Sequence, residues 1–175
     1  PADQRRTWLL KTPMYLAMLD DILRAYPDAK IVQTHRAPSE SIASWASVQA
    51  RMWGVASDHV DLHGIGKYVS GLASRLVAKS MSSRRRDAKL DSRIADVQLA
   101  DLKHDAIGTV ARVYAQLGIT LTAEAQAAME AWLERKQVRH GGHRARLIDF
   151  DLDEEGVMAD PVFAEYCERF GVACP

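Results

Sequence analysis

The sequence predicts an α/β domain in which a parallel sheet is covered by many helices. Two apolar strand candidates and two amphipathic helices alternate within the first 54 residues, and this order requires crossover connections between parallel strands. Hydrophobic residues make up 47% of the 175-residue chain and charged residues 26%, values that are typical of a globular protein with its own core. We therefore expect one domain over residues 1–175.

The first alternating unit is defined by apolar runs and by proline positions. The segment Thr7 to Lys11 predicts a short buried strand, and residues 29–34 predict a second strand. Between them, apolar side chains at helical spacing predict a helix over residues 14–26. Pro38 suits the first turn of the next helix, which is expected to end near Gly54. The apolar face expected to be buried in that helix consists of Ile42, Trp45, Val48 and Met52.

The second half of the chain is predicted to be mostly helical, with a third strand at residues 94–99. The basic run Arg84 to Arg86 predicts a solvated helix end, and the alternative is that it contacts an acidic partner. Helices are expected over residues 58–90, 105–118, 122–133 and 161–170.

Charge and composition exclude several classes of protein. Twenty-three basic residues balance twenty-three acidic ones, which argues against a nucleic-acid binder or a membrane-surface protein. No apolar run is long enough for a membrane span, and no signal peptide opens the chain. Cys167 and Cys174 are too few for a disulfide framework or a zinc site. His59 and His63 have the i, i+4 spacing of a ligand pair on a helix, but no Glu or third ligand lies nearby in the sequence. A cytoplasmic location without a metal is the expectation.

Two cationic residues stand where predicted strands end. Arg36 follows the second strand and Lys11 ends the first, and ligands of open parallel sheets bind beyond the carboxyl ends of strands. Arg36 suits bidentate contact with a phosphate or sulfate, and Ser44, about two turns into the next helix, would add a hydroxyl. The alternative is that Arg36 pairs with a neighbouring carboxylate, that Ser44 packs, and that Lys11 is an exposed strand end.

Together these segments resemble the PAPS-dependent sulfotransferases, where PAPS is 3′-phosphoadenosine 5′-phosphosulfate. The resemblance is to the bacterial sulfotransferase-like branch related to carbohydrate and tyrosylprotein sulfotransferases, and it is weakest over residues 55–90. The segments that carry it are Trp8-Leu9-Leu10-Lys11-Thr12-Pro13, His35-Arg36-Ala37-Pro38 with Ser44, Gly142-His143-Arg144 and Arg169-Phe170-Gly171.

The resemblance implies a P-loop-nucleotide-kinase-like parallel sheet and transfer of a sulfuryl group from PAPS to a hydroxyl or amine. The acceptor would be a small molecule or a carbohydrate. By the same resemblance, Arg36 and Ser44 would bind the 3′-phosphate of PAPS, and Lys11 would neutralise charge around the transferring group. A basic loop would fold over the nucleotide through Arg139, His143 and Arg144.

The sequence also departs from the family pattern. The first strand and the Gly-rich loop that cradles the 5′-phosphosulfate have no counterpart, and Tyr15, Leu99 and Ala145 replace a usual histidine and two usual tyrosines. We therefore expect the C-terminal part of a larger domain, weak or inactive alone, with an open sheet edge that favours a homodimer. Two alternatives stay open: a non-catalytic sulfotransferase-like or truncated nucleotide-binding or interaction domain, and another P-loop enzyme such as a kinase.

Overall fold

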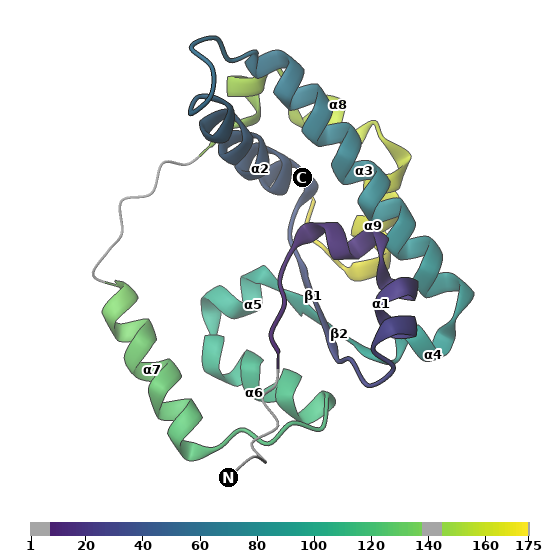
Figure 1. Ribbon diagram of the computed structural model, residues 1–175, viewed down its shortest axis with the longest axis vertical. Helices are drawn as coiled ribbons and strands as arrows, with labels where there is room; N and C mark the ends of the chain where they lie inside the picture. Colours follow the sequence, from purple (N-terminus) through teal and green to yellow (C-terminus); the bar gives the residue numbers. More distant parts are fainter. Residues whose placement is uncertain (1–7, 138–144, 175) are drawn as a thin grey trace.

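The computed structural model describes residues 8–137 and 145–174, and these residues form a mixed α/β fold that is mostly helical (Figure 1). Its elements, in chain order, are the short 3-10 helix η1 (Pro13–Ala17), α1 (Leu19–Ala25), β1 (Ile31–His35), α2 (Pro38–Trp53), α3 (Leu62–Arg86), α4 (Ala88–Asp91), β2 (Ile94–Gln98), α5 (Leu99–His104), α6 (Ala106–Gln116), α7 (Ala123–Gln137), the 3-10 helix η2 (Leu147–Phe150), α8 (Glu154–Met158) and α9 (Pro161–Phe170).

The sheet consists of β1 and β2, which pair in parallel from Ile31 opposite Ile94 to His35 opposite Gln98. The strand expected at Thr7 to Lys11 was a wrong prediction, since residues 8–12 are irregular. A strand needs a hydrogen-bonding neighbour, and within the described ranges β1 pairs only with β2.

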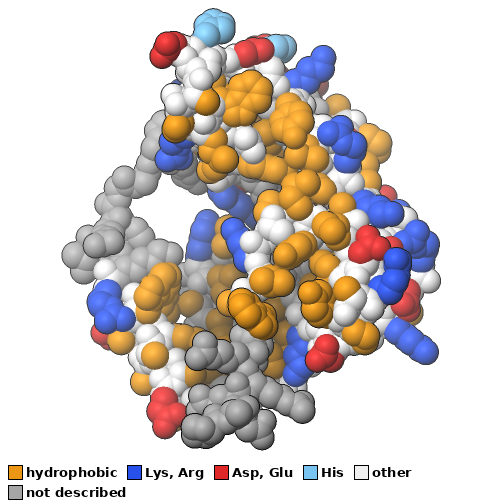
Figure 2. All heavy atoms as spheres, viewed as in Figure 1, with side chains coloured by type: hydrophobic (Ala, Val, Ile, Leu, Met, Phe, Trp, Pro, Cys, Tyr) orange, Lys and Arg blue, Asp and Glu red, His pale blue; other side chains and the backbone are white. Residues whose placement is uncertain are grey.

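The N-terminal segment therefore stays exposed instead of entering a sheet. Trp8 is 85% exposed and Leu9 is 93% exposed, and Leu10, Met14 and Met18 are also exposed. Figure 2 shows hydrophobic side chains gathered in a broad band across one face of the molecule. An apolar surface of this kind is typical of an interaction face.

The two faces of β1 differ in what covers them. Gln33 and His35 are buried, whereas Val32 and Thr34 on the opposite face are exposed. The buried face meets α3 and α9, because Ser80 of α3 donates to Gln33 and Tyr166 of α9 contacts His35. The long α3 runs along one side of the molecule, with α9 beside it (Figure 1).

The main core is formed by residues of α2, α3, η2, α8 and α9. Gly66 allows α3 to approach η2 closely, since a Cβ there would stand 2.4 Å from the Phe150 carbonyl oxygen. The buried residues of this core are Ile42, Ala46, Ile65, Val69, Phe150, Val157 and Phe163.

The predicted core face of α2 was only partly right. Ile42 is buried and Trp45 packs against the core, but Val48 and Met52 are exposed. The buried positions are completed by small residues, Ala43, Ala46 and Ser47. Small side chains at these positions let the helix pack closely against its neighbours.

The prediction of a solvated helix end holds for Arg85 and Arg86, which are exposed, but was wrong for Arg84. Arg84 is 4% exposed, while Arg85 pairs with Glu165 and Arg86 with Asp20. Helical periodicity places position 84 on the same face as the buried Leu76 and Ser80. The basic run therefore ties α3 to α1, β2 and α9.

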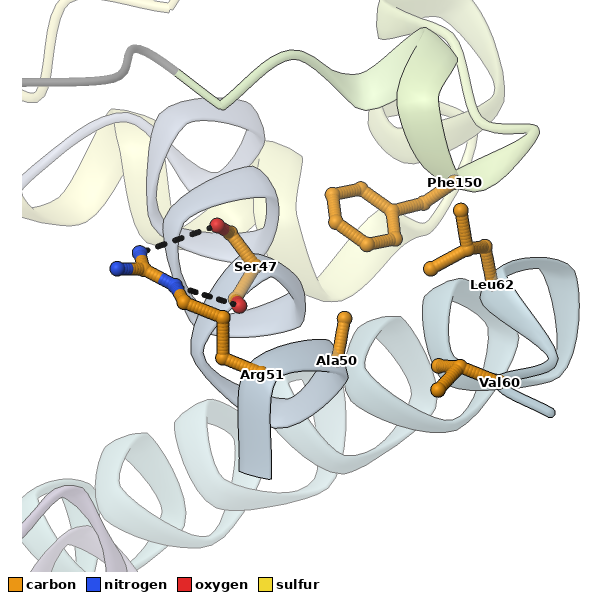
Figure 3. A pocket seen from close by; sticks show the side chains of 6 residues that line it. All are labelled: Ser47, Ala50, Arg51, Val60, Leu62 and Phe150. Atoms are coloured by element: carbon orange, nitrogen blue, oxygen red, sulfur yellow. Dashed lines mark hydrogen bonds between the residues drawn. The ribbon is translucent and has the colours of Figure 1, made fainter. Parts of the chain in front are cut away.

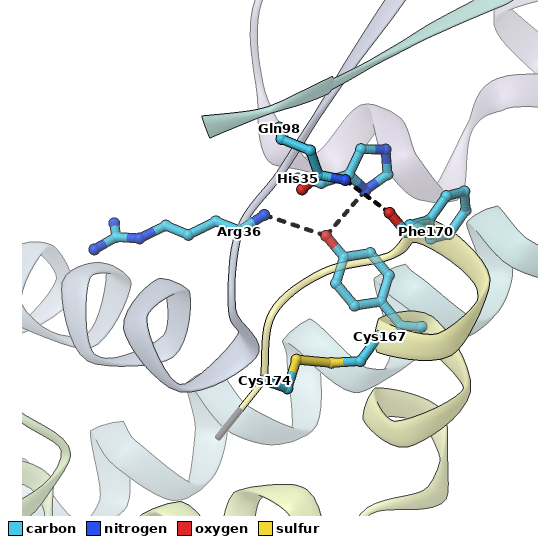
Figure 4. Close-up of a disulfide and its surroundings, with 7 residues drawn as sticks. His35, Arg36, Gln98, Cys167, Phe170 and Cys174 are labelled. Carbon is cyan, nitrogen blue, oxygen red and sulfur yellow. Dashed lines mark hydrogen bonds between the residues drawn. A yellow bond between two sulfur atoms is a disulfide. The ribbon is translucent and has the colours of Figure 1, made fainter. Parts of the chain in front are cut away.

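The C-terminal tail is fastened to α9 by a disulfide between Cys167 and Cys174, which lie seven residues apart (Figure 4). Gly171 ends α9 at φ +60°, and the chain turns back there. The two cysteines had been judged too few for a disulfide framework, and this single bridge went unpredicted. Among the described residues, no helix combines the length and the apolar character needed to cross a bilayer.

Candidate functional site

The candidate site begins where β1 ends and α2 starts. Arg36 follows the last residue of β1, and Pro38 occupies the first turn of α2, where its missing N–H costs no hydrogen bond. The N-cap residue, Ala37, has no side-chain oxygen and makes no capping hydrogen bond. The N–H groups of the first turn of this 16-residue helix therefore present a positive end without a side-chain cap.

A small cavity of about 170 Å³ lies along α2 beside this end. Binding pockets for drug-sized ligands measure roughly 300–1,000 Å³, so this cavity suits a group of phosphate size. Arg36 and Ser44, which the sequence placed on one anion, both line it. Its lining is Arg36, Glu40, Ser44, Ser47, Val48, Arg51 and Ala145.

Arg36 forms an ion pair with Glu40 inside the site. Pairing with a neighbouring carboxylate was the alternative prediction for this arginine. Its Nε donates to Glu40 Oε2 over 2.7 Å, and both side chains are partly exposed. The pair leaves the two terminal nitrogens of Arg36 without a hydrogen bond to any described residue. Because Nε is fixed on Glu40, these two donors remain for an incoming anion.

Arg51 is a second cation in the cavity, and the sequence analysis missed it. Its Nε donates to the Ser47 carbonyl and its Nη2 to Ser47 Oγ, both over 3.3 Å (Figure 3). Arg51 and Ser47 also border a larger, mostly apolar cavity of about 410 Å³, completed by Ala50, Val60, Leu62 and Phe150. The sequence spacing could have predicted Arg51 as a site residue, because positions 44, 47 and 51 lie on one face of the helix.

The structure does not place the other predicted site residues in either cavity. Lys11 is exposed just before η1 and lines neither cavity. Arg139, His143 and Arg144 lie outside the described residues. Ala145, which directly follows that segment, does line the small cavity.

A polar cluster lies next to Arg36. His35, Gln33, Arg84 and Tyr166 are its buried members, and its fifth member, Asp96, is exposed. His35 is 1% exposed, its Nε2 lies 2.7 Å from Asp96 Oδ1, and its Nδ1 lies 3.1 Å from the Tyr166 hydroxyl. The ring of Phe170 stacks on His35 at a centroid distance of 4.4 Å. Figure 4 shows the hydrogen bonds that the Tyr166 hydroxyl forms with His35 and with the Arg36 backbone.

Arg84 closes the cluster on its other side. Its two terminal nitrogens donate to Asp96 over 2.8 and 2.7 Å, and one also reaches Gln33 Oε1 over 3.1 Å. Burial works against the charge of Arg84, but hydrogen bonds to Asp96 and Asp91 outweigh it and raise the pKa of Arg84 above its ordinary value. The arginine is thus a fixed cation inside the fold.

The same contacts shift the pKa values of the acidic members. Burial opposes ionisation of Asp96, yet hydrogen bonds from Arg84 and His35 lower its pKa to about 2. Burial raises the pKa of Tyr166 to about 12. Asp96 is therefore a carboxylate and Tyr166 a neutral hydroxyl at neutral pH.

The sequence analysis did not find this cluster. The pairing of β1 with β2 brings position 35 within reach of position 96, and α9 then adds position 166. Two of its members had a local signal. Arg84 lies on the buried stripe of α3, and the helical spacing of Tyr166 with Val162 and Phe170 predicts that it faces inward.

The histidines of the described segments form no metal centre. Within those segments, no group of three His, Cys, Asp or Glu side chains is arranged to hold a metal ion. His63, which the sequence spaces four residues from His59, instead pairs through Nδ1 with Asp151 over 2.7 Å.

Comparison with known proteins identifies the family. Residues 1–123 match the family model described as the sulfotransferase family, and the chain belongs to that family. No curated protein sequence gives a significant match.

Two solved sulfotransferase structures share the fold. Sulfotransferase STF9 from Mycobacterium avium superposes with a TM-score of 0.81 at 24% identity, covering 95% of this chain and 42% of its own. Sulfotransferase STF1 from Mycobacterium tuberculosis H37Rv superposes with a TM-score of 0.68 at 30% identity, covering 91% of this chain and 40% of its own. The chain thus spans less than half the length of either protein.

Proposed function

We propose that this chain binds the 3′-phosphate of PAPS in the small cavity beside α2 and takes part in sulfuryl transfer. The observation that carries the proposal is the meeting of Arg36, at the end of β1, with Ser44, about two turns along α2, in one phosphate-sized cavity. Membership in the sulfotransferase family supports the chemistry, and the strand-end position is where parallel sheets bind ligands.

Each group would act on the phosphate in a distinct way. The terminal nitrogens of Arg36 would donate to two phosphate oxygens, and the Ser44 hydroxyl would donate to a third. The uncapped start of α2 adds its positive end. Glu40 holds Arg36 Nε over 2.7 Å, which limits the directions in which the guanidinium can point.

Transfer itself needs stabilisation of the charge that develops on the departing phosphate oxygens. The acceptor oxygen or nitrogen attacks sulfur, the bond from sulfur to the 5′-phosphate oxygen breaks, and the acceptor proton passes to a base or to solvent. Lys11 is our candidate for stabilising that charge, by analogy with phosphoryl transfer. We propose a small molecule or a carbohydrate as acceptor.

Calorimetry with 3′,5′-ADP, the desulfated product, tests the phosphate site. Arg36→Ala should weaken binding by roughly 10- to 150-fold, because a charge-assisted hydrogen bond is worth about 1.5–3 kcal/mol. Arg24→Ala is the matched control, since it removes an exposed arginine of α1. As a second control, 5′-AMP lacks the 3′-phosphate and should bind the wild-type and Arg36→Ala proteins equally. Equal binding of 3′,5′-ADP by both proteins would refute the assignment.

A second candidate function is binding without transfer, as a non-catalytic nucleotide-binding or interaction domain. The observation that favours it is the position of Lys11, which is exposed and lines neither cavity. A radiolabelled sulfate-transfer assay against sugars, phenols and lipids separates the two. Turnover that Lys11→Ala abolishes supports the enzyme, whereas tight 3′,5′-ADP binding without turnover supports the binding domain.

A further inference from the structure

We propose that the hydroxyl of Tyr166 is a positioning group for Arg36, and that through it the C-terminal helix α9 sets the geometry of the phosphate site. The inference rests on the proposed function, since it concerns the same site. Tyr166 lies 130 residues from Arg36 in sequence, and its hydroxyl accepts a hydrogen bond from the Arg36 backbone N–H over 3.4 Å.

The donors and acceptors around this hydroxyl assign the direction of each hydrogen bond. Asp96 is an acceptor only, so His35 Nε2 carries the proton that it donates to that carboxylate. Of the two partners of the Tyr166 hydroxyl, the Arg36 N–H can only donate, so the Tyr166 O–H donates to His35 Nδ1. The lone pairs of the Tyr166 oxygen accept the Arg36 N–H.

The cluster beneath holds this hydroxyl in one place. His35 cannot rotate without losing Asp96, and Asp96 is held by two hydrogen bonds from the buried Arg84. Phe170, one turn along α9 from Tyr166, stacks on the histidine ring. The hydroxyl oxygen therefore has a fixed position relative to β1, and so has the peptide that contacts it.

Fixing the Arg36 peptide matters because the chain leaves the strand there. Arg36 carries the guanidinium of the proposed phosphate site, and the helix start follows at Pro38. A shift of the backbone at the strand end would move the guanidinium relative to Ser44 and to the α2 N–H groups, and binding geometry is sensitive to displacements on the order of 1 Å.

Tyr166→Phe tests the proposal, since it removes the hydroxyl and retains the ring that packs in the cluster. Hydrogen exchange of the Arg36 amide, followed by NMR, should become roughly tenfold faster, with amides of α7 unchanged. Affinity for 3′,5′-ADP should fall roughly fivefold to tenfold. Imidazole ¹⁵N shifts of His35 should report an Nδ1 that has lost its donor.

Two variants serve as controls for mere destabilisation. Tyr68→Phe alters an exposed tyrosine on α3 and should leave all three readouts unchanged. Val172→Ala removes packing from a small apolar cluster made of Met81, Tyr166 and Val172 and should lower the free energy of unfolding. Hydrogen exchange of the Arg36 amide and the affinity for 3′,5′-ADP should stay as in the wild type.

The outcomes separate this inference from the proposed function. If the wild-type protein does not bind 3′,5′-ADP, the proposed function fails, and the Arg36 amide and the His35 shifts alone decide whether Tyr166 positions that peptide. An Arg36 amide equally protected in Tyr166→Phe overturns the inference. So does an affinity for 3′,5′-ADP that falls equally in Val172→Ala, because the effect would then be one of stability.

Discussion

His35 and Arg36 are neighbours in sequence but belong to two different environments. The His35 side chain is buried, with hydrogen bonds on both ring nitrogens, whereas the Arg36 side chain is partly exposed and makes one ion pair along α2. The boundary between the polar cluster of the fold and the cavity of the candidate site therefore runs between two consecutive residues.

The difference teaches how a binding arginine is held at a strand end. Beneath the strand end, His35, Arg84 and Tyr166 each have hydrogen-bond partners, which is what burial requires. Above it, Arg36 keeps two nitrogens without a described hydrogen-bond partner beside Ser44. We call the polar cluster around His35 and Asp96 the lower layer, and the small cavity with Arg36 and Ser44 the upper layer. The lower layer is rigid and supports the upper layer, whose hydrogen-bond donors remain for a ligand.

The largest expected effect is on stability, from the lower layer. Asp96→Ala should lower the free energy of unfolding by about 2–4 kcal/mol, because it leaves the buried Arg84 and His35 without their shared carboxylate. Urea denaturation measures this. Asp21→Ala, which breaks an exposed ion pair with Arg24, is the control and should cost about 0.5 kcal/mol or less. An equal loss of unfolding free energy in the two variants would show that the contacts of Asp96 stabilise the fold no more than an exposed ion pair does.

Arg36→Lys probes the upper layer without changing its charge. Lysine cannot donate to two oxygens in a planar fork, so affinity for 3′,5′-ADP should fall about tenfold, with unfolding free energy unchanged within about 0.5 kcal/mol. Calorimetry and urea denaturation of the same preparation measure the two quantities. Full retention of affinity would mean that a point charge suffices at this position.

Acid titration sharpens the account of the lower layer. The pKa of Asp96 is lowered to about 2, below an unfolded value near 3.9, so its contribution to stability is present above about pH 4 and is lost as the pH falls towards 2. The difference in unfolding free energy between wild type and Asp96→Asn should shrink by about 1 kcal/mol across this window, a value reduced because the Asp96 side chain is 37% exposed. A difference that stays constant from pH 5 to 2 would contradict the assigned hydrogen bonds.

Ser44→Ala should give the smallest change. Loss of one neutral hydroxyl contact is worth about 0.5–1 kcal/mol, so affinity for 3′,5′-ADP should fall about two- to fivefold with stability unaffected. Ser41→Ala, on the same helix and outside the cavity lining, is the control for calorimetry. A Ser44→Ala effect no greater than that of Ser41→Ala would remove the hydroxyl from the site.

The sequence predicted that Arg36 and Ser44 lie together beside α2, but it predicted neither Arg51 in the same cavity nor the polar cluster next to it. The order of strand, Arg36, Pro38 and helix is local, so apolar patterning and proline chemistry placed Arg36 and Ser44 on one side of α2. His35, Asp96 and Tyr166 meet only through strand pairing and the docking of α9, which no local pattern encodes.

The failed predictions have related causes. The segment from Thr7 to Lys11 has an apolar strand pattern, but forming a strand depends on a neighbour that local sequence cannot supply. The run from Arg84 to Arg86 was judged by its charge alone, although its helical phase places the first arginine on the buried face. Charged residues on a buried stripe need partners elsewhere in the fold.

An NMR titration of the isotope-labelled protein with 3′,5′-ADP tests the central claim most directly. The account predicts saturable shifts that are largest at the Arg36 side-chain Nε–H, the amides of Ser39 and Glu40, and Ser44, with α1 unaffected. Saturable binding whose shifts centre on Val60 and Leu62 of the larger cavity, and spare the start of α2, would contradict it.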